Sequence, residues 1–370
     1  MKHILRVIAA CSAVCIMLSG CSAGSSTVDS TLPAETTVDS PAETTAETTA
    51  ETTAEPETTS AEAETTTAPA EETKRFTFQP KVCSVFMEEV FGKTMCEAWD
   101  HLVDAVMAGE DTFPCPDQHT YDWVMGQFPR RCFPVLDELI GTFGNPAQQV
   151  VDGTARFTYL VPQEEAAARI TKFAEQIEGI LNEALEPDDS DFEKAFKLYR
   201  YFYEHYQYDY DTEKKMYEEY VDYLSPCRLL NTGIGVCSEI SPAYSYLLMQ
   251  TGTEATTMMG GAHEWSYVRI GGKNYHIDPT FVLASEGSLS YLLMTDDQRD
   301  SDGFSRKEYV ICSNYAQDHP HPDYIADDKT FSAIWDYNFD QIIPDKQILR
   351  CWQYTEGWEK DYFDFDYSGY

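Results

Sequence analysis

The chain has 370 residues, with 63 acidic and 26 basic side chains and a formal net charge of −37. This charge excludes nucleic acid as an expected partner, because contacts to phosphate need clustered lysine and arginine. A cationic or neutral peptide is a more compatible substrate, although an acidic surface can also serve solubility alone.

The first 21 residues have the order of a secretory signal, in which Lys2 and Arg6 precede an apolar stretch that ends in Leu-Ser-Gly-Cys. The stretch is short for a membrane span. Its ending is similar to a bacterial lipobox, which implies that Cys21 becomes a lipidated N-terminus. We therefore expect an extracytoplasmic protein anchored by lipid to the bacterial cell membrane. The alternative is ordinary secretion, with Cys21 incidental.

Residues 22–74 consist mainly of Thr, Ala, Glu and Pro, include the repeat TTAETTAETTAE and contain no aromatic residue. Such a segment buries too little apolar surface to offset the entropy lost on ordering, so we expect a disordered stalk. Beyond it we divide the chain into an accessory region at 75–154, a main domain at 155–300 and a C-terminal extension at 301–370.

Eleven cysteines are present, and eight of them follow Cys21. An exported protein can form disulfides, but eight cysteines allow too many pairings to be read from sequence. The chain has no Cys-x-x-Cys pair, which gives little support to a zinc ribbon or a thioredoxin-like site. His319 and His321 could bind a metal, although a polar loop is the simpler interpretation. We expect no metal or other cofactor.

The first predicted elements precede the cysteine motif. Residues 76–150 predict short helices, such as one over 95–107, joined by loops. Residues 155–161 alternate like a strand. A helix is expected from Pro162, because apolar residues then recur at helical spacing. The run Asp-Ser-Asp at 189–191 offers an N-cap for a second, aromatic-rich helix.

The stretch NTGIGVCSEISPAYSYLL, residues 231–248, predicts a buried helix. Pro242 lacks an N–H and is tolerated only near a helix start or at a kink, so we expect the helix to begin between Ser238 and Ser241. Gly252 follows as a C′ residue. The residues at helical spacing on one face are Ile240, Ala243, Tyr244, Leu247 and Leu248.

Cys237 then lies at the mouth of this helix, close to its unpaired N–H groups and the positive end of its dipole. Such a position lowers the pKa of a thiol and favours thiolate. Gly233 and Gly235 allow the chain to turn tightly before it. The alternatives for Cys237 are a disulfide and a small apolar residue in the core.

A strand at 255–259 precedes a predicted hairpin, in which residues 265–270 and 273–278 are joined by a Gly-Gly turn. The two-residue loop fixes the register. His263 and Asp278 become diagonal neighbours on one face of the sheet, about 7–8 Å apart or somewhat less at their Cβ atoms. An imidazole and a carboxylate can meet across that gap.

Together these residues form the parts of a thiol nucleophile site. Cys237 supplies the nucleophile, His263 the base and Asp278 the group that orients the imidazole. Backbone N–H groups at the helix start can stabilise an oxyanion. This set of groups supports acyl transfer through a thioester, with hydrolysis by water or transamidation by an amine.

The ordered motifs GVC, AHEW and YHIDPT resemble the transglutaminase-like superfamily over about residues 155–300, and specifically over 225–285. The resemblance implies an α+β, papain-like core in which the helix bearing the cysteine packs on an antiparallel sheet. It also implies the triad Cys237, His263 and Asp278, and activity on peptides or proteins. Glu239 and Pro242 depart from the family pattern at the helix start.

Members of the family also use a further oxyanion donor upstream of the cysteine, which implies Tyr208, or Tyr206, for that role. Ordinary packing is the alternative for both tyrosines. His263 could instead be a strand histidine with satisfied hydrogen bonds, and Asp278 could cap a turn. We interpret His276 as a neighbour rather than the base, because we expect no carboxylate suitably placed to orient it.

We therefore expect a surface-anchored thiol enzyme, either a peptidase or a protein-glutamine transamidase. One alternative is a binding module of the same fold without catalysis, and another is a disulfide-scaffold adhesin, in which Cys237 is bridged. The acidic, aromatic end EGWEKDYFDFDYSGY either binds a partner or covers the core. The sequence gives neither the substrate nor the oligomeric state.

Overall fold

The computed structural model describes residues 75–218, 224–311 and 324–370. The predicted signal and stalk, and the loop with His319 and His321, lie outside these ranges. The described part combines helices with mostly antiparallel strands, as the α+β prediction requires. None of the helices described within these ranges is long and apolar enough to span a membrane.

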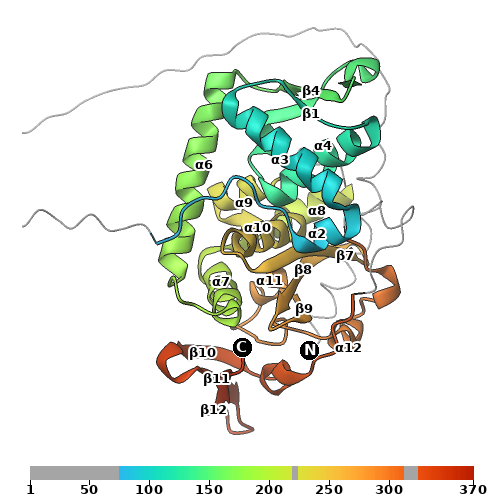
Figure 1. The fold of residues 1–370 in the computed structure, drawn as a ribbon. Coiled ribbons are helices and arrows are strands. Elements are labelled where there is room, and N and C mark those ends of the chain that lie inside the picture. Colours follow the sequence, from blue (N-terminus) through green and yellow to red (C-terminus); the bar gives the residue numbers. More distant parts are fainter. Residues whose placement is uncertain (1–74, 219–223, 312–323) are drawn as a thin grey trace, which may run out of the picture. The chain divides into compact units, whose positions relative to one another are not determined.

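The centre of the fold is helix α10 (Cys237–Gln250) packed on the antiparallel sheet β7-β8-β9 (Figure 1). Hydroxyl groups join the two layers: Ser241 donates to the Glu264 carbonyl and Ser245 to the Thr256 carbonyl, each at 2.9 Å. On the other side Tyr244 donates to the Ala195 carbonyl of helix α7. The strands are β7 (Glu254–Gly260), β8 (His263–Ile270) and β9 (Lys273–Ile277).

The first described residues form helices and a small sheet that share one hydrophobic core with α10. The predicted helix over 95–107 is confirmed as α3, and the strand over 155–161 as β4. The helices are α2 (Val85–Phe91), α3 (Lys93–Ala108), α4 (Gln118–Cys132) and α5 (Leu136–Leu139), with the short η2 (Pro146–Gln148). The strands are β1 (Thr112–Pro114), β2 (Ile140–Thr142), β3 (Val150–Val151) and β4 (Thr154–Tyr159).

Two long helices lead into the centre, as the sequence predicted. Helix α6 (Gln163–Ala184) follows Pro162, and α7 (Asp191–His205) begins with a capping box between Ser190 and Glu193. The chain then forms β5 (Gln207–Tyr208), α8 (Tyr210–Glu218), α9 (Pro226–Thr232) and β6 (Ile234–Gly235).

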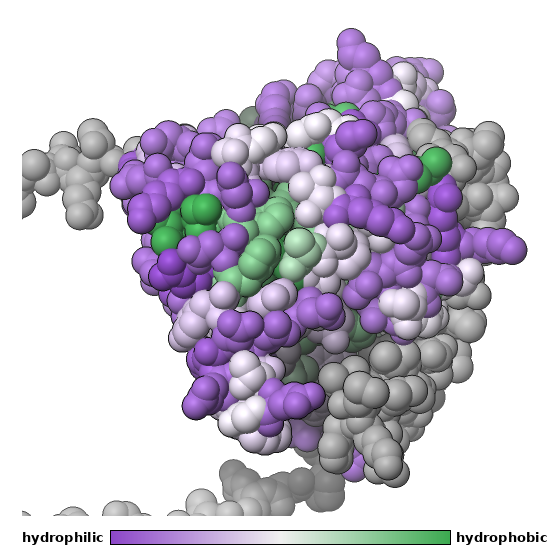
Figure 2. All heavy atoms as spheres, turned by 90° about the horizontal axis from the view of Figure 1, so that it is seen from below, coloured by the Kyte–Doolittle hydropathy of each residue, from purple (hydrophilic) through white to green (hydrophobic). Residues whose placement is uncertain are grey.

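The last described part covers the lower side of the molecule in Figure 1, and Figure 2 shows that side with a small apolar patch among mostly hydrophilic side chains. Helix α11 (Pro279–Val282) lies in the centre beside α7 and α10. The helices of the last part are α12 (Asp296–Ser301), η3 (Arg306–Glu308), η4 (Thr330–Ile334) and η5 (Pro344–Lys346). The antiparallel sheet β10-β11-β12 consists of Asn338–Ile343, Ile348–Tyr354 and Lys360–Asp366.

Helix α10 begins at Cys237, so the predicted start between Ser238 and Ser241 was wrong. Pro242 lies inside the helix and cannot donate to the Ser238 carbonyl four residues earlier. The Arg130 guanidinium of α4 donates to that carbonyl instead. A distant arginine therefore satisfies the carbonyl that the proline leaves without a donor, and the helix begins one residue before the predicted range.

The predicted hairpin register is confirmed, with Ile270 opposite Lys273 across Gly271 and Gly272. Both glycines have positive φ, as a two-residue turn of this kind requires. Strand β8 nevertheless begins at His263, two residues before the predicted start, because a second tight turn joins it to β7. Ala262 in that turn has a φ of 61°, a strained conformation for a residue with a side chain, directly before His263.

Glu239, which departs from the family pattern, anchors the start of α10. Its fully buried carboxylate accepts hydrogen bonds from the backbone N–H groups of Val236 and Ser225. It also pairs with Arg228, which bridges to Asp209 at 2.8 Å. The hydrogen bonds that Arg228 donates to Glu239 are the main reason that the pKa of Arg228 is raised. The segment before Cys237 is thus tied to the helix by one carboxylate.

We predict that Glu239→Gln lowers the free energy of unfolding by about 3 kcal/mol, because a neutral amide replaces the fully buried carboxylate that accepts two backbone N–H groups and pairs with Arg228. Denaturant titration followed by far-UV circular dichroism measures the change. The control is Glu165→Gln, which removes a half-exposed pair with Arg169 and should cost less than about 0.5 kcal/mol. Equal effects of the two variants would contradict the anchoring role.

Candidate functional site

Cys237 is the first residue of α10, carries a thiol and is half-buried. Strand β6, two residues before it, pairs in parallel with β5, so that Tyr208 lies opposite Gly235. The short β5–β6 pair and the Glu239 anchor together fix where the thiol emerges. Its position at a helix N-terminus, where backbone N–H groups lack partners within the helix, is the one that the sequence predicted.

The imidazole of His263 is completely buried and is held on two sides. Its Nε2 atom lies 2.7 Å from Oδ2 of Asp278, and its ring stacks on Phe281 with centroids 4.9 Å apart. The predicted contact between His263 and Asp278 is therefore confirmed. A carboxylate only accepts hydrogen bonds, so Nε2 carries the proton in this pair.

The second ring nitrogen of His263, Nδ1, is buried without a hydrogen-bond partner among the described residues. Ser241 of α10 donates to the carbonyl of Glu264, the residue after His263. Cys237 precedes Ser241 by one helical turn and lies on the same face of α10. The thiol and the imidazole therefore occupy the same end of the contact between α10 and β8.

Asp278 combines two roles that the sequence offered as alternatives. Its Oδ1 atom caps α11 by accepting from the N–H groups of Thr280 and Phe281, at 3.0 and 3.3 Å. Its Oδ2 atom accepts from His263 and from Arg299. Burial by itself raises the pKa of Asp278, but the attraction of His263 and Arg299 and these hydrogen bonds outweigh it and lower the pKa.

Arg299 is a site residue that the sequence prediction missed. It is fully buried in α12, donates to Asp278 Oδ2 at 2.9 Å and lies 3.6 Å from Asp302. Its guanidinium lies over the rings of Trp265 and Phe304, at 4.5 and 4.2 Å. The only sequence signal was a single cation inside the acidic run DDQRDSD.

Successive contacts link four charged or titratable side chains: His263 with Asp278, Asp278 with Arg299, and Arg299 with Asp302. Burial raises the pKa of Asp302 to about 6, and Arg299 opposes that shift. Protonation of Asp302 removes part of the negative charge that balances Arg299.

The reason given for setting His276 aside was wrong, because a carboxylate does lie beside it. His276 Nε2 is 2.9 Å from Asp296, and Trp265 donates to its Nδ1 at 2.8 Å. Both ring nitrogens are therefore occupied. Burial is the main cause that lowers the pKa of His276, which keeps the ring neutral. The structure thus assigns His276 to a packed, hydrogen-bonded position for a different reason.

The two tyrosines considered as oxyanion donors lie in different surroundings. Tyr206 is buried and its ring packs on Phe202 with centroids 4.8 Å apart, in agreement with a packing role. Tyr208 is half-buried, is paired beside Gly235 and contacts Tyr210 at 4.9 Å. Of the two, Tyr208 lies in the strand pair that leads directly to Cys237.

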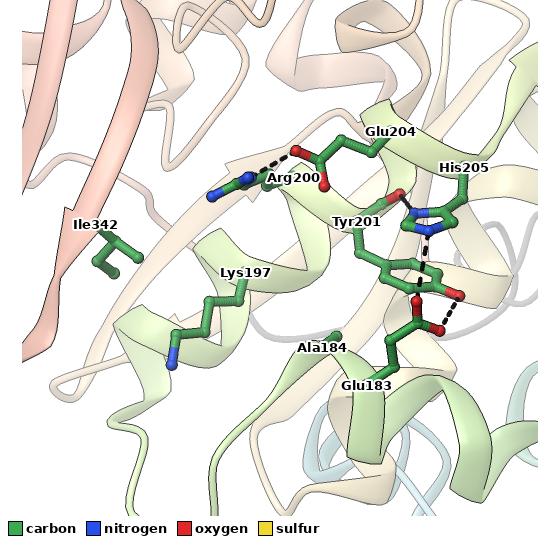
Figure 3. A pocket seen from close by; sticks show the side chains of 8 residues that line it. All are labelled: Glu183, Ala184, Lys197, Arg200, Tyr201, Glu204, His205 and Ile342. Atoms are coloured by element: carbon green, nitrogen blue, oxygen red, sulfur yellow. Dashed lines mark hydrogen bonds and ion pairs between the residues drawn. The ribbon is translucent and has the colours of Figure 1, made fainter.

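Figure 3 shows a pocket of about 290 Å³ between α6, α7 and β10. None of Cys237, His263 and Asp278 lines it. Its charged groups already have partners: Arg200 donates to Glu204 at 2.7 Å, Lys197 donates to Asp189 outside the pocket, and Glu183 accepts from the Tyr201 hydroxyl at 3.4 Å. Because these charges already have partners, the pocket offers little to a charged ligand and is separate from the candidate site.

Metal binding and disulfide bonding are the two other chemistries open to cysteines and carboxylates in the part of the chain that the structure describes. No group of three or more His, Cys, Asp or Glu side chains there could hold a metal ion. Seven cysteines carry thiols rather than disulfides: Cys83, Cys96, Cys115, Cys132, Cys227, Cys237 and Cys351. The adhesin alternative, in which Cys237 is bridged, therefore has no support in the structure.

Comparison with known proteins gives one result. The family model described as the transglutaminase-like superfamily matches residues 178–287, a segment that runs from α6 past α11 and includes Cys237, His263 and Asp278. A search of curated proteins found no match. Residues 178–287 of this chain are therefore a domain of the transglutaminase-like superfamily.

Proposed function

We propose that this protein is a surface-anchored thiol enzyme that acts on amide bonds of peptides or proteins. The proposed triad is Cys237, His263 and Asp278, in a papain-like arrangement of a cysteine-bearing helix against an antiparallel sheet. The reaction passes through a thioester on Cys237 and ends in hydrolysis or in transamidation. The anchor is the lipid predicted on Cys21, and the location is the outer side of the bacterial cell membrane.

The observation that carries this proposal is the buried pair of His263 and Asp278 at the same end of the α10–β8 contact as Cys237. Asp278 fixes the proton on Nε2 and leaves Nδ1 to serve a second group. An imidazole held in this way can accept the proton of a thiol and return it later to a leaving amine. A strand histidine in a packing role alone does not need an unpartnered buried nitrogen.

The chemistry proceeds in two halves. Cys237 sulfur, having given its proton to His263, attacks the amide carbonyl carbon, and a C–S bond forms as the carbonyl π electrons move to oxygen. The C–N bond then breaks, and the amine leaves with the proton from His263. In the second half, water or an amine gives a proton to His263 and attacks the thioester carbon. The C–S bond breaks, and the thiolate of Cys237 is restored.

We assign stabilisation of the oxyanion to the N–H groups of Cys237 and Ser238 in the first turn of α10, at the positive end of its dipole. The next two N–H groups, of Glu239 and Ile240, already donate to the Val236 carbonyl. We propose Tyr208, whose backbone pairs with Gly235 two residues before Cys237, as a further donor.

The non-catalytic binding module remains a second candidate, because the site is closed in this structure. His263 and Asp278 are fully buried, and Phe304 packs over the imidazole with centroids 5.3 Å apart. Phe304 also lies against the tight turn before His263, where a side chain at Gly261 would approach it to 3.1 Å. Access of an acyl group to the imidazole therefore requires movement around Phe304.

The first prediction concerns the reactivity of Cys237. Iodoacetamide at pH 7, with adducts mapped by mass spectrometry, should modify Cys237 first and about 100-fold more slowly in His263→Ala, because the imidazole promotes the thiolate. Cys83 is an internal reference: it is also half-buried, but hydrogen bonding with Cys132 raises its pKa. His205→Ala, which alters a more exposed histidine on α7, is the matched control.

The opposite pattern would count against the proposal: modification of Cys237 no faster than that of Cys83, or no change on replacing His263. The background rate is measured with a folded Cys237→Ser variant, in which iodoacetamide should modify all the remaining thiols slowly.

The second prediction is a pH dependence set by Asp302. Above pH 6 ionised Asp302 balances Arg299, so that Asp278 can support a charged His263. The rate of Cys237 modification in the wild type, divided by that in Asp302→Asn, should therefore rise between about pH 5 and pH 7. Taking this ratio cancels the ionisation of the thiol itself. A ratio that stays constant over this range would show that Asp302 does not act on the triad.

The third prediction separates enzyme from binding module. A peptide library incubated with the full chain, with and without a primary amine, should yield cleaved or amine-linked products that are absent with Cys237→Ala. The product masses distinguish hydrolysis from transamidation. Binding of a library peptide that survives in Cys237→Ala, with no product from the wild type, would instead establish the binding module.

A further inference from the structure

The C-terminal hairpin of β11 and β12 has two different faces, because residues directly opposite each other across the strands point to the same side. On one side Leu349 and Phe365 are opposite each other and buried. Just beyond β12, Tyr367 is also buried and donates its hydroxyl to Glu193 of α7 at 2.7 Å. This face covers the core, which is one of the two roles that the sequence allowed for the acidic, aromatic end.

The other side, which we call the aromatic face, consists of Trp352, Tyr354, Trp358 and Tyr362. The rings of Trp352 and Tyr354 are 5.0 Å apart, and those of Tyr354 and Trp358 are 5.7 Å apart. Three of these side chains are open to solvent, with exposed fractions of 46% for Tyr354, 81% for Trp358 and 53% for Tyr362. In Figure 1 the hairpin lies at the lower end of the molecule.

Trp358 lies in the turn between the strands, where it is exposed to solvent and its backbone is strained. Trp358 has a φ of 62°, in the left-handed region, which is strained for a residue with a side chain. Hydrogen bonds fix the turn: Trp358 N–H donates to the Thr355 carbonyl, and Thr355 N–H to the Glu359 carbonyl, at 3.0 and 2.9 Å. An exposed tryptophan in a strained, fixed turn adds nothing to the core, and points to a role in binding.

The charge around the aromatic face favours a cation. Residues 348–366 contain only two basic side chains, and one of them, Lys360, already places its ammonium 3.6 Å from the Trp352 ring centroid. The other, Arg350, pairs with Asp364 at 2.7 Å. The same segment also contains the exposed carboxylates of Glu356, Glu359 and Asp366, besides Asp364, which pairs with Arg350, and Asp361, which lies opposite Gln353 on the other side of the hairpin.

We propose that the aromatic face binds an extended, Lys- or Arg-bearing segment of another polypeptide. Ring faces attract the cation through their quadrupoles, and the neighbouring carboxylates strengthen that attraction. The same carboxylates repel anionic lipid headgroups, and a neutral glycan gains nothing from them. The site lies on the hairpin, outside the transglutaminase-like segment, and does not depend on the proposed catalysis.

The indole N–H resonances of the full chain provide a test at the level of one side chain. The chain has six tryptophans, and the signal that disappears in Trp358→Ala is that of Trp358. Titration with tetra-arginine should move this signal to saturation, whereas tetra-glutamate should leave it in place. Because the reading comes from Trp358 itself, binding of the peptide to other acidic parts of the chain does not obscure it.

Variants that keep the net charge test the contribution of the rings. Tyr362→Ala should weaken the affinity read from the Trp358 signal about fivefold, as expected for the loss of one ring. Tyr210→Ala removes a comparably exposed ring on α8 and should change nothing. A Trp358 signal that does not move with tetra-arginine would overturn the proposal. Movement with an N-acetylglucosamine tetramer alone would overturn it in favour of a glycan site.

Discussion

The carboxylate of Asp278 is the group on which the candidate site depends. A buried negative charge is tolerated only when it is hydrogen-bonded and paired, and Asp278 meets that condition with the N–H groups of Thr280 and Phe281 and the side chains of His263 and Arg299. These four donors come from three separate parts of the chain: the start of α11, the start of β8 and the single arginine of α12. Changing any of them alters the charge that the imidazole experiences.

The other half of the site depends on a second buried carboxylate. Glu239 holds the N–H of Val236 and the guanidinium of Arg228, and thereby fixes the backbone from which Cys237 emerges. Arg130 completes the first turn of α10 at the carbonyl that Pro242 leaves open. The thiol and the imidazole are thus positioned by separate anchors that meet only through the packing of α10 on β8. Both anchors lie on rigid elements, as a preorganised site requires.

The sequence predicted those parts of the site that short-range rules determine. A two-residue glycine turn has one compatible register, so the meeting of His263 and Asp278 followed from counting along the strands. The start of α10 was missed because its stabilising partner, Arg130, lies more than 100 residues away. Arg299 and Asp296 were missed for the same reason: no local pattern shows that α12 returns to the hairpin. Long-range pairing of charges needs the structure.

The role of the terminal hairpin also could not be predicted from local sequence. Its alternating acidic and aromatic residues fit either a core cover or a binding surface, and composition alone could not separate the two. The pairing of β11 with β12 turns alternate residues toward the core and toward the opposite side of the hairpin. One short segment therefore closes the core of the molecule with Phe365 and Tyr367 while it presents Trp358 to solvent.

The central claim is that the sulfur of Cys237 and the imidazole of His263 exchange a proton. The ¹⁵N chemical shifts of the His263 ring, compared between the wild type and Cys237→Ser at neutral pH, measure this most directly. The account predicts a proton on Nε2 in both proteins, and a proton on Nδ1 only where Cys237 is present to supply it. Identical shifts in the two proteins, with Nδ1 unprotonated in each, would contradict it.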